Sequence, residues 1–103
     1  MKKIRYHREA RAEYDAAAAW YEDRSPGVGD DFIDAVEHAE AAIAAMPRTW
    51  PKWPNLDPHI GARRYLLDGF PFSIAYLDRE NEIVVLAIAH DRRRPRYWSE
   101  RSA

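Results

Sequence analysis

The most constraining feature of this sequence is an unbroken apolar run at residues 83–89, where no polar residue alternates with the apolar ones. A strand with one face in water alternates polar and apolar side chains, so this run predicts a central strand that is covered on both faces. A chain of 103 residues supplies one hydrophobic core. We therefore expect a single domain over residues 1–103, with other elements packed on both sides of this strand.

Two helices are predicted in the first half of the chain. Residues 8–24 are rich in alanine, and their alanines and tyrosines recur at helical spacing. Residues 25–29 contain serine, proline and glycine and interrupt this helix. A second helix follows and ends at Pro47; Asp30 or Asp31 is expected to cap it, because a carboxylate there accepts from free backbone N–H groups. The short connection predicts an antiparallel helical hairpin.

Strands and one irregular loop account for the remaining segments. Residues 2–7 alternate weakly and predict a first strand, and residues 62–67 and 72–77 predict two more. Four prolines and two tryptophans in residues 47–59 predict an ordered loop whose indoles cover the core. The order β-α-α-β-β-β predicts an α+β fold, with an antiparallel sheet and the helical hairpin packed on one face.

Composition excludes several classes of site. The chain has no cysteine, and its four histidines lie far apart without metal-ligand spacing, so we expect no metal and no cofactor. The first residues carry two lysines with no apolar stretch behind them, so we expect no signal peptide. No segment approaches the ~20 apolar residues that span a bilayer. A cytoplasmic protein is expected.

Charge is distributed unevenly along the chain. The net charge is -1, which does not suit a protein that finds nucleic acid through its overall field. Residues 1–61 carry eight Lys or Arg and eleven Asp or Glu, whereas residues 62–103 carry eight Arg and six Asp or Glu. The second part is therefore the one expected to bind an anion, above all through the arginines of the string AHDRRRPRYWSE at residues 89–100.

This second part resembles a known group of toxins. The strings RRYLLDGFPFSIAYL, IVVLAIAH and RRRPRYWSER resemble the RelE/ParE toxin superfamily of bacterial type II toxin–antitoxin systems, and in particular its plasmid stabilisation proteins. A closing His-x-x-Arg-x-Pro-x-Tyr-Trp motif falls on the residues from His90 to Trp98. In the first part, a Trp-Tyr pair at the end of the first helix and a Pro-Gly-x-Gly break are similar too. The resemblance covers almost the whole chain and agrees with the predicted order of elements.

The resemblance implies a cytosolic toxin that is held inactive by an antitoxin encoded beside it. Members of the superfamily act in two main ways: some cut messenger RNA in the ribosomal decoding site, and others inhibit DNA gyrase by binding. A fold alone does not choose between these activities.

Cleavage of RNA without a metal needs a base for the ribose 2'-hydroxyl, cations for the charged phosphate and an acid for the leaving oxygen. By motif position, the resemblance implies catalytic roles for four residues: His90, Arg93, Tyr97 and Arg64. It implies contacts with RNA phosphates for four others: Arg63, Arg92, Arg94 and Arg96. Neighbouring residues of a strand point to opposite faces, so at most one of Arg63 and Arg64 lines any given site.

Each of these residues also has a structural interpretation. His90 can anchor the tail through a hydrogen bond, and Tyr97 and Trp98 can fold back over the sheet edge. The low net charge and the scarcity of lysine favour a gyrase inhibitor without catalysis, or a non-toxic antitoxin-binding module. Since His90, Arg93 and Tyr97 together supply cleavage chemistry, the slightly preferred hypothesis is a metal-independent endoribonuclease (mRNA interferase) acting with the ribosome.

The expected partner under every hypothesis is the antitoxin. We predict an acidic segment, partly helical and partly extended, that folds on this domain and covers the arginine-rich tail. Four residues are expected to contact it: Arg93, Arg94, Arg96 and Trp98. Arginine forks paired with carboxylates would make the complex sensitive to salt.

Overall fold

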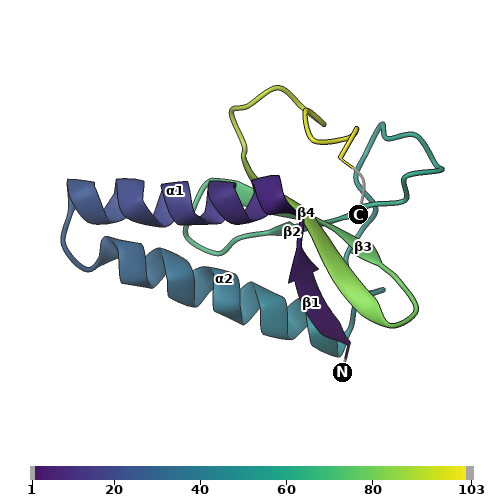
Figure 1. The fold of residues 1–103 in the computed structure, drawn as a ribbon, viewed down its shortest axis with the longest axis horizontal. Helices are drawn as coiled ribbons and strands as arrows, with labels where there is room; N and C mark the ends of the chain where they lie inside the picture. Colours follow the sequence, from purple (N-terminus) through teal and green to yellow (C-terminus); the bar gives the residue numbers. More distant parts are fainter. Residues whose placement is uncertain (1, 102–103) are drawn as a thin grey trace.

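The computed structural model describes residues 2–101. It consists of a four-stranded sheet with two antiparallel helices packed against one face (Figure 1). The elements follow in the order β1 (Lys3–Tyr6), α1 (Arg8–Arg24), α2 (Val28–Ala45), β2 (Arg63–Leu66), β3 (Phe72–Asp78) and β4 (Glu82–His90). The predicted α+β fold and its element order are confirmed.

The helical hairpin forms because both helices bury an apolar stripe. In α1 the stripe contains Ala10, Tyr14 and Ala17, and in α2 it runs from Phe32 to Ile43. These stripes pack on the inner face of the sheet and make the larger part of the core. The hairpin packed on one face is the arrangement that the sequence predicts.

The start of α2 differs from the prediction. The residue at the N-cap is Gly27 with φ 90°, and Asp30 and Asp31 lie in the first turn. The Glu22 carboxylate of α1 instead accepts from the backbone N–H groups of Gly27 and Gly29, at 3.0–3.1 Å. The left-handed glycine turns the chain tightly enough for a carboxylate from the preceding helix to satisfy donors that a capping aspartate was expected to satisfy.

The sheet has the strand order β1-β4-β3-β2 and is mixed, which corrects the expectation of an antiparallel sheet. The pairs β4–β3 and β3–β2 are antiparallel, but β1 pairs parallel to β4, with Ile4 beside Ile83. No tight turn joins β1 to β4, so chain connection does not impose an antiparallel direction. The parallel pairing places Ile4 and Tyr6 against the helix-side core.

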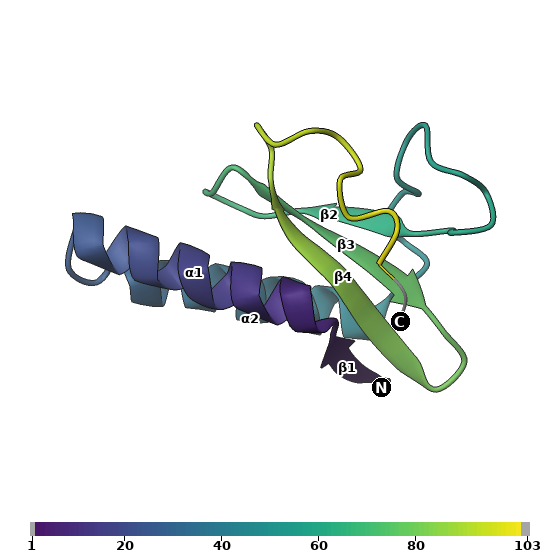
Figure 2. The same ribbon diagram turned by 45° about the horizontal axis from the view of Figure 1, so that its top comes forward.

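A second, smaller core covers the other face of the sheet. Val84, Leu86 and Ala87 of β4 pack there against Trp98 of the tail and Trp53 of the loop before β2. Figure 2 shows the loop and the tail on the side of the sheet away from α1 and α2. The central strand is therefore covered on both faces, as its unbroken apolar run predicts.

Candidate functional site: the arginine-rich tail

The tail leaves β4 through His90, whose side chain is half-buried. Its Nδ1 accepts from the backbone N–H of Arg92 at 3.1 Å, and its ring meets the edge of Phe72 with centroids 5.0 Å apart. An imidazole that accepts at Nδ1 carries its proton on Nε2 when it is neutral. His90 therefore anchors the start of the tail while part of its ring stays accessible.

A carboxylate from α1 organises the side of the tail that faces the helices. Glu13 Oε2 accepts from the Tyr97 hydroxyl at 2.6 Å, from Arg101 at 2.9 Å and from Arg93 at 3.4 Å. Glu13 Oε1 accepts from Arg101 at 3.0 Å and from the backbone N–H of Ile88 at 3.1 Å. One acidic side chain thus holds three tail residues against the body of the protein. We call Glu13, Arg93, Tyr97 and Arg101 the Glu13 cluster.

The environment of this cluster keeps the Tyr97 phenol neutral. Burial raises the pKa of Tyr97 above its usual range, and the hydrogen bond to the Glu13 carboxylate raises it further. The Arg93 guanidinium lies over the phenol ring, 3.7 Å from its centroid. Tyr97 and Arg93 therefore have partners within the protein, although the Arg93 side chain is still 55% exposed.

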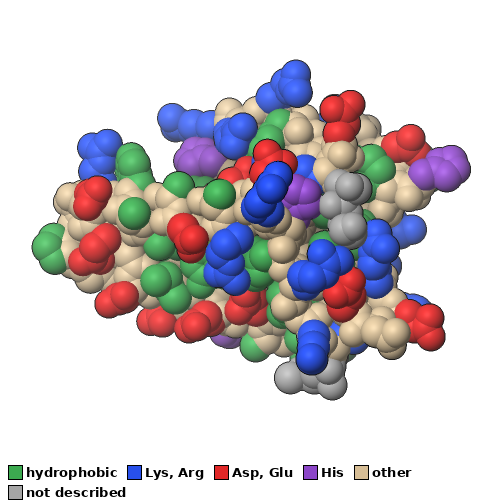
Figure 3. All heavy atoms as spheres, in the orientation of Figure 1, with side chains coloured by type: hydrophobic (Ala, Val, Ile, Leu, Met, Phe, Trp, Pro, Cys, Tyr) green, Lys and Arg blue, Asp and Glu red, His purple; other side chains and the backbone are tan. Residues whose placement is uncertain are grey.

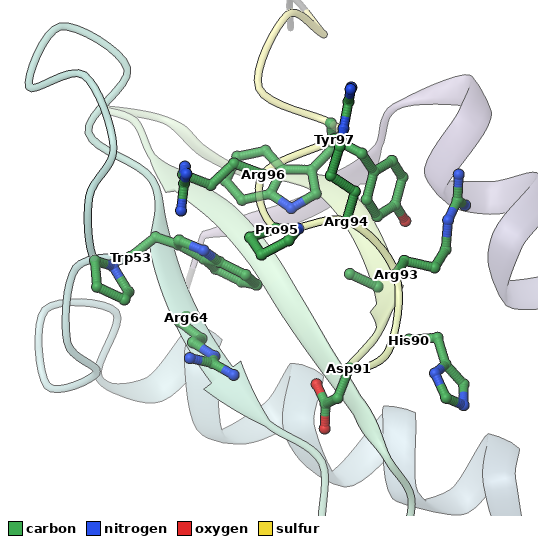
Figure 4. Close-up of a pocket in the computed structure, with 12 residues that line it drawn as sticks. Trp53, Arg64, His90, Asp91, Arg93, Arg94, Pro95, Arg96 and Tyr97 are labelled. Carbon is green, nitrogen blue, oxygen red and sulfur yellow. The ribbon is translucent and has the colours of Figure 1, made fainter.

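A hollow of about 260 Å³ lies on the other side of the tail, over the second face of the sheet. Figure 4 shows Arg64 and Arg96 on the Trp53 side of the tail, while His90 and Arg93 point to the opposite side. Arg64 lies 4.8 Å from the Trp53 ring centroid, and its Nε donates to Ser73 Oγ at 3.3 Å. Ser73 in turn donates to Asp91 at 2.9 Å. Four arginines, one histidine and one carboxylate therefore line the hollow, together with aromatic and apolar side chains.

The backbone of the tail turns at Arg96, beside the hollow. Arg96 has φ 60°, in the left-handed region that side chains other than glycine rarely adopt. Two arginines, Arg94 and Arg96, line the hollow from the tail, opposite Arg64 of β2. We call Arg64, Arg94 and Arg96 the arginine surface.

The hollow brings together most of the predicted site residues, namely Arg64, His90, Arg93, Arg94, Arg96 and Tyr97, whereas Arg63 and Arg92 lie outside its lining. Arg63 points to the helix side and donates to the Trp50 carbonyl at 2.7 Å, so strand parity separates it from Arg64 as expected. Arg92 is exposed beside His90. Trp98 is fully buried in the second core, so it has no surface to offer an antitoxin. The sequence predicts that Trp98 covers the edge of the sheet, but its ring packs on the face of the sheet opposite the helices.

Two residues that matter here were not predicted. Glu13 lies on what reads as the polar face of the first helix, and Arg101 belongs to the chain end. Arg101 also donates to the Leu86 carbonyl at 2.9 Å, and its side chain is only 12% exposed. Nothing in their local sequence signals this contact, because it joins residues 88 positions apart.

An apolar groove of about 580 Å³ runs between α1 and the end of β4. Trp20 lies at one end with 52% of its surface exposed, and the Arg24 guanidinium lies 4.3 Å from its ring centroid. Arg93 and His90 line the other end. The lining of the groove is mainly apolar; Glu13, His90 and Arg93 are its charged or polar members, and Arg24 lies over Trp20. Among residues 2–101, no three His, Asp or Glu side chains gather into a possible metal site, and no helix could cross a membrane.

Comparison with known proteins agrees with this architecture. The chain resembles a solved structure described as the chromosomal ParDE TA system from P. aeruginosa, with a TM-score of 0.72 and 22% sequence identity. The match covers 87% of this chain and 96% of the other. No curated protein matches the chain. The structural match establishes that the two chains share this α+β fold.

The family follows from the sequence itself. Residues 4–95 match the family model described as ParE toxin of type II toxin-antitoxin system, parDE. The match spans both helices and all four strands. The chain belongs to the ParE toxin family.

Proposed function

We propose that this toxin inhibits DNA gyrase by binding, without catalysis, and that it acts in the cytoplasm. The observation that supports this proposal is the Glu13 cluster. Two of the groups nominated for RNA cleavage, Tyr97 and Arg93, share one carboxylate acceptor from α1. A cleaving enzyme would have to break these contacts before either group could meet the scissile phosphate.

The charge of the chain supports the same proposal. The net charge is -1, and Figure 3 shows acidic side chains along the helical hairpin, while basic and acidic side chains lie side by side at the opposite end. A protein that binds the phosphate-rich ribosome is expected to be more uniformly basic. The arginine surface is instead a local cationic patch, suited to one docking contact on a protein or a protein–DNA complex.

Messenger RNA cleavage remains the second candidate, and one observation favours it. His90 lines both the hollow and the groove and lies beside Arg93 on the face turned toward α1. In that case His90 would act as the acid or base and the arginine surface would hold phosphates. This candidate needs Arg93 to move from Glu13, and Arg93 has the longest of the contacts to that carboxylate.

The antitoxin is proposed to lie in the apolar groove and to reach Arg93. The groove joins exposed Trp20 to the tail, and its two ends carry Arg24 and Arg93. An amphipathic acidic helix matches that pattern, because its apolar face would fill the groove and its carboxylates would pair with the arginines. Such a helix would cover Arg93, and from there the acidic segment could extend toward Arg94 and Arg96.

Induced expression with two parallel readouts tests the proposal. The wild-type chain should accumulate gyrase-linked DNA breaks and alter plasmid supercoiling, while translated messenger RNA stays intact. An Arg94→Glu/Arg96→Glu variant should lose this effect, because reversal replaces the attraction at the arginine surface with repulsion. Arg79→Glu reverses one charge on the distant β3–β4 turn and is the matched control for each single variant, Arg94→Glu and Arg96→Glu. Cut transcripts with normal supercoiling would contradict the proposal.

A further inference from the structure

The outer edge of β2 is only half covered. At its start, the Arg64 N–H donates to the Pro51 carbonyl and the Trp53 N–H donates to the Ala62 carbonyl, both at 2.9 Å. Backbone groups alternate in direction along an antiparallel strand, and Leu67 donates inward to Phe72. The Leu66 N–H and the Arg64 carbonyl therefore point outward, and no backbone group from elsewhere in residues 2–101 bonds to them.

A hollow of about 730 Å³ lies along this open stretch. Its apolar lining includes Trp50 and Tyr65, whose rings meet edge to face at 4.7 Å, and Leu66, which is 62% exposed. Proteins usually protect an edge strand with charge, proline or a covering segment. Here the covering segment stops at residues 51–53 and leaves a large apolar side chain next to unpaired backbone groups.

The charges around the open edge indicate what it binds. Lys52 and Arg64 line the hollow, with His38 from α2, and Asp68 is the one carboxylate among the lining residues. We propose that an extended acidic segment of the antitoxin adds to the sheet here as a fifth strand, antiparallel or parallel to β2. Its backbone bonds the Leu66 N–H and the Arg64 carbonyl, and its carboxylates lie near Lys52. This inference rests on the proposed function only in identifying the acidic partner as the antitoxin.

A second copy of the chain fits this edge less well. Antiparallel pairing of two β2 strands across a two-fold axis at the open stretch would place the Arg64 side chains of both copies on the same face of the joined sheet. Like charges in one interface cost binding energy, whereas an acidic strand gains it from the same residues. The charge of the edge therefore favours the acidic segment.

Amide hydrogen exchange, measured by NMR with a short synthetic peptide of alternating valine and glutamate, tests the inference. When the free peptide concentration is ten times the dissociation constant, exchange of the Leu66 amide should slow by about tenfold. The Tyr65 and Leu67 amides, which already bond to β3, should change little and serve as internal references. A matched peptide with lysine in place of glutamate should bind at least about fivefold more weakly.

Two variants complete the test. Leu66→Pro removes the outward N–H without removing a bond to β3, a change that edge strands tolerate, and should weaken binding by about tenfold. Lys52→Glu should weaken it several-fold and keeps the backbone intact, while Arg79→Glu should leave it unchanged. Unaltered Leu66 exchange with saturating peptide would overturn the inference. So would Leu66 protection that appears with rising protein concentration alone, because that result assigns the edge to a second copy. Neither result depends on the gyrase readout.

Discussion

Glu13 shows how one side chain can decide whether neighbouring residues are reactive or structural. Its carboxylate meets two guanidinium groups, one phenol and one backbone N–H, and its side chain is only 15% exposed. Every lone-pair direction of the carboxylate therefore has a donor. In a different setting, Arg93 and Tyr97 would suit phosphate chemistry, but beside Glu13 they hold the tail in place.

Replacing Glu13 should therefore destabilise the protein. Glu13→Ala removes the carboxylate that Arg101, which is 12% exposed, bonds through both of its terminal nitrogens, and should lower the free energy of unfolding by about 2–3 kcal/mol. Urea denaturation measures this change. Glu9→Ala is the matched control on the same helix, since Glu9 is 59% exposed and lies 3.6 Å from Arg101; it should cost less than about 0.5 kcal/mol. Equal effects of the two changes would contradict the role assigned to Glu13.

Tyr76 should make stability depend on alkaline pH. Burial raises the pKa of Tyr76 to about 12, and its hydroxyl donates to the Pro47 carbonyl at 2.6 Å. The unfolded chain releases this proton near pH ~10, so the contribution of Tyr76 is complete below that pH and is lost as pH rises toward the folded value. Urea unfolding of Tyr76→Phe should therefore show a smaller loss of stability from pH ~10 to ~12 than wild type. An identical slope in both proteins would contradict this assignment.

At the scale of elements, the sequence predicts what each segment forms better than how segments join. The spacing of the apolar residues and the positions of proline and glycine predict α1, α2 and the strands, because an element that buries one stripe or face needs apolar residues at that spacing. The cap of α2 comes from Glu22 of the preceding helix, and the partner of β1 comes from the far end of the chain. Both are tertiary contacts, and no local pattern of residues encodes them.

The close approach of the two helices depends on Gly29. A Cβ there would lie 2.8 Å from the Ala18 carbonyl oxygen and 2.8 Å from Glu22 Cβ. Alanine favours a helix over glycine by about 1 kcal/mol, yet Gly29→Ala should destabilise the protein by about 2 kcal/mol, because the helices must separate. Comparing the thermal unfolding of Gly29→Ala with that of Gly69→Ala isolates the effect of the clash between the helices. Gly69 has φ 82°, and a Cβ added there would have no neighbouring atom within 4 Å, so that change should cost only about 1 kcal/mol of backbone strain. A stabilising Gly29→Ala would contradict the packing.

At the scale of the whole molecule, one hollow gathers four arginines from the second part of the chain. The sequence predicts an anion-binding region there, and Arg64, Arg93, Arg94 and Arg96 all line this hollow. Arg93 and Arg101 also pair with an acidic residue from α1, some 80 positions earlier. Charge counted along the sequence does not reveal such pairing, because it depends on which faces the fold brings together. The site roles of these residues stay predictions.

The binding of the antitoxin should depend on salt through the exposed arginines, including Arg93, whose side chain is 55% exposed beside Glu13. Its complex with this chain should weaken by about tenfold between 0.05 and 0.5 M NaCl, as screening removes attraction at exposed arginines. Arg93→Glu should weaken the complex and reduce this salt dependence, and the control Arg79→Glu should do neither. Isothermal titration calorimetry measures both quantities. A complex that is indifferent to salt and to Arg93→Glu would contradict the charged contact.

The most direct test of non-catalytic inhibition compares Tyr97→Phe with wild type in a gyrase supercoiling assay and on translating ribosomes. Tyr97→Phe removes the hydroxyl that donates to Glu13, which should cost about 1 kcal/mol of stability and leave the arginine surface intact. We predict that both proteins inhibit gyrase at similar concentrations and that neither cuts messenger RNA. Ribosome-dependent cleavage by wild type that falls by about a hundredfold or more in Tyr97→Phe would contradict the proposed mechanism.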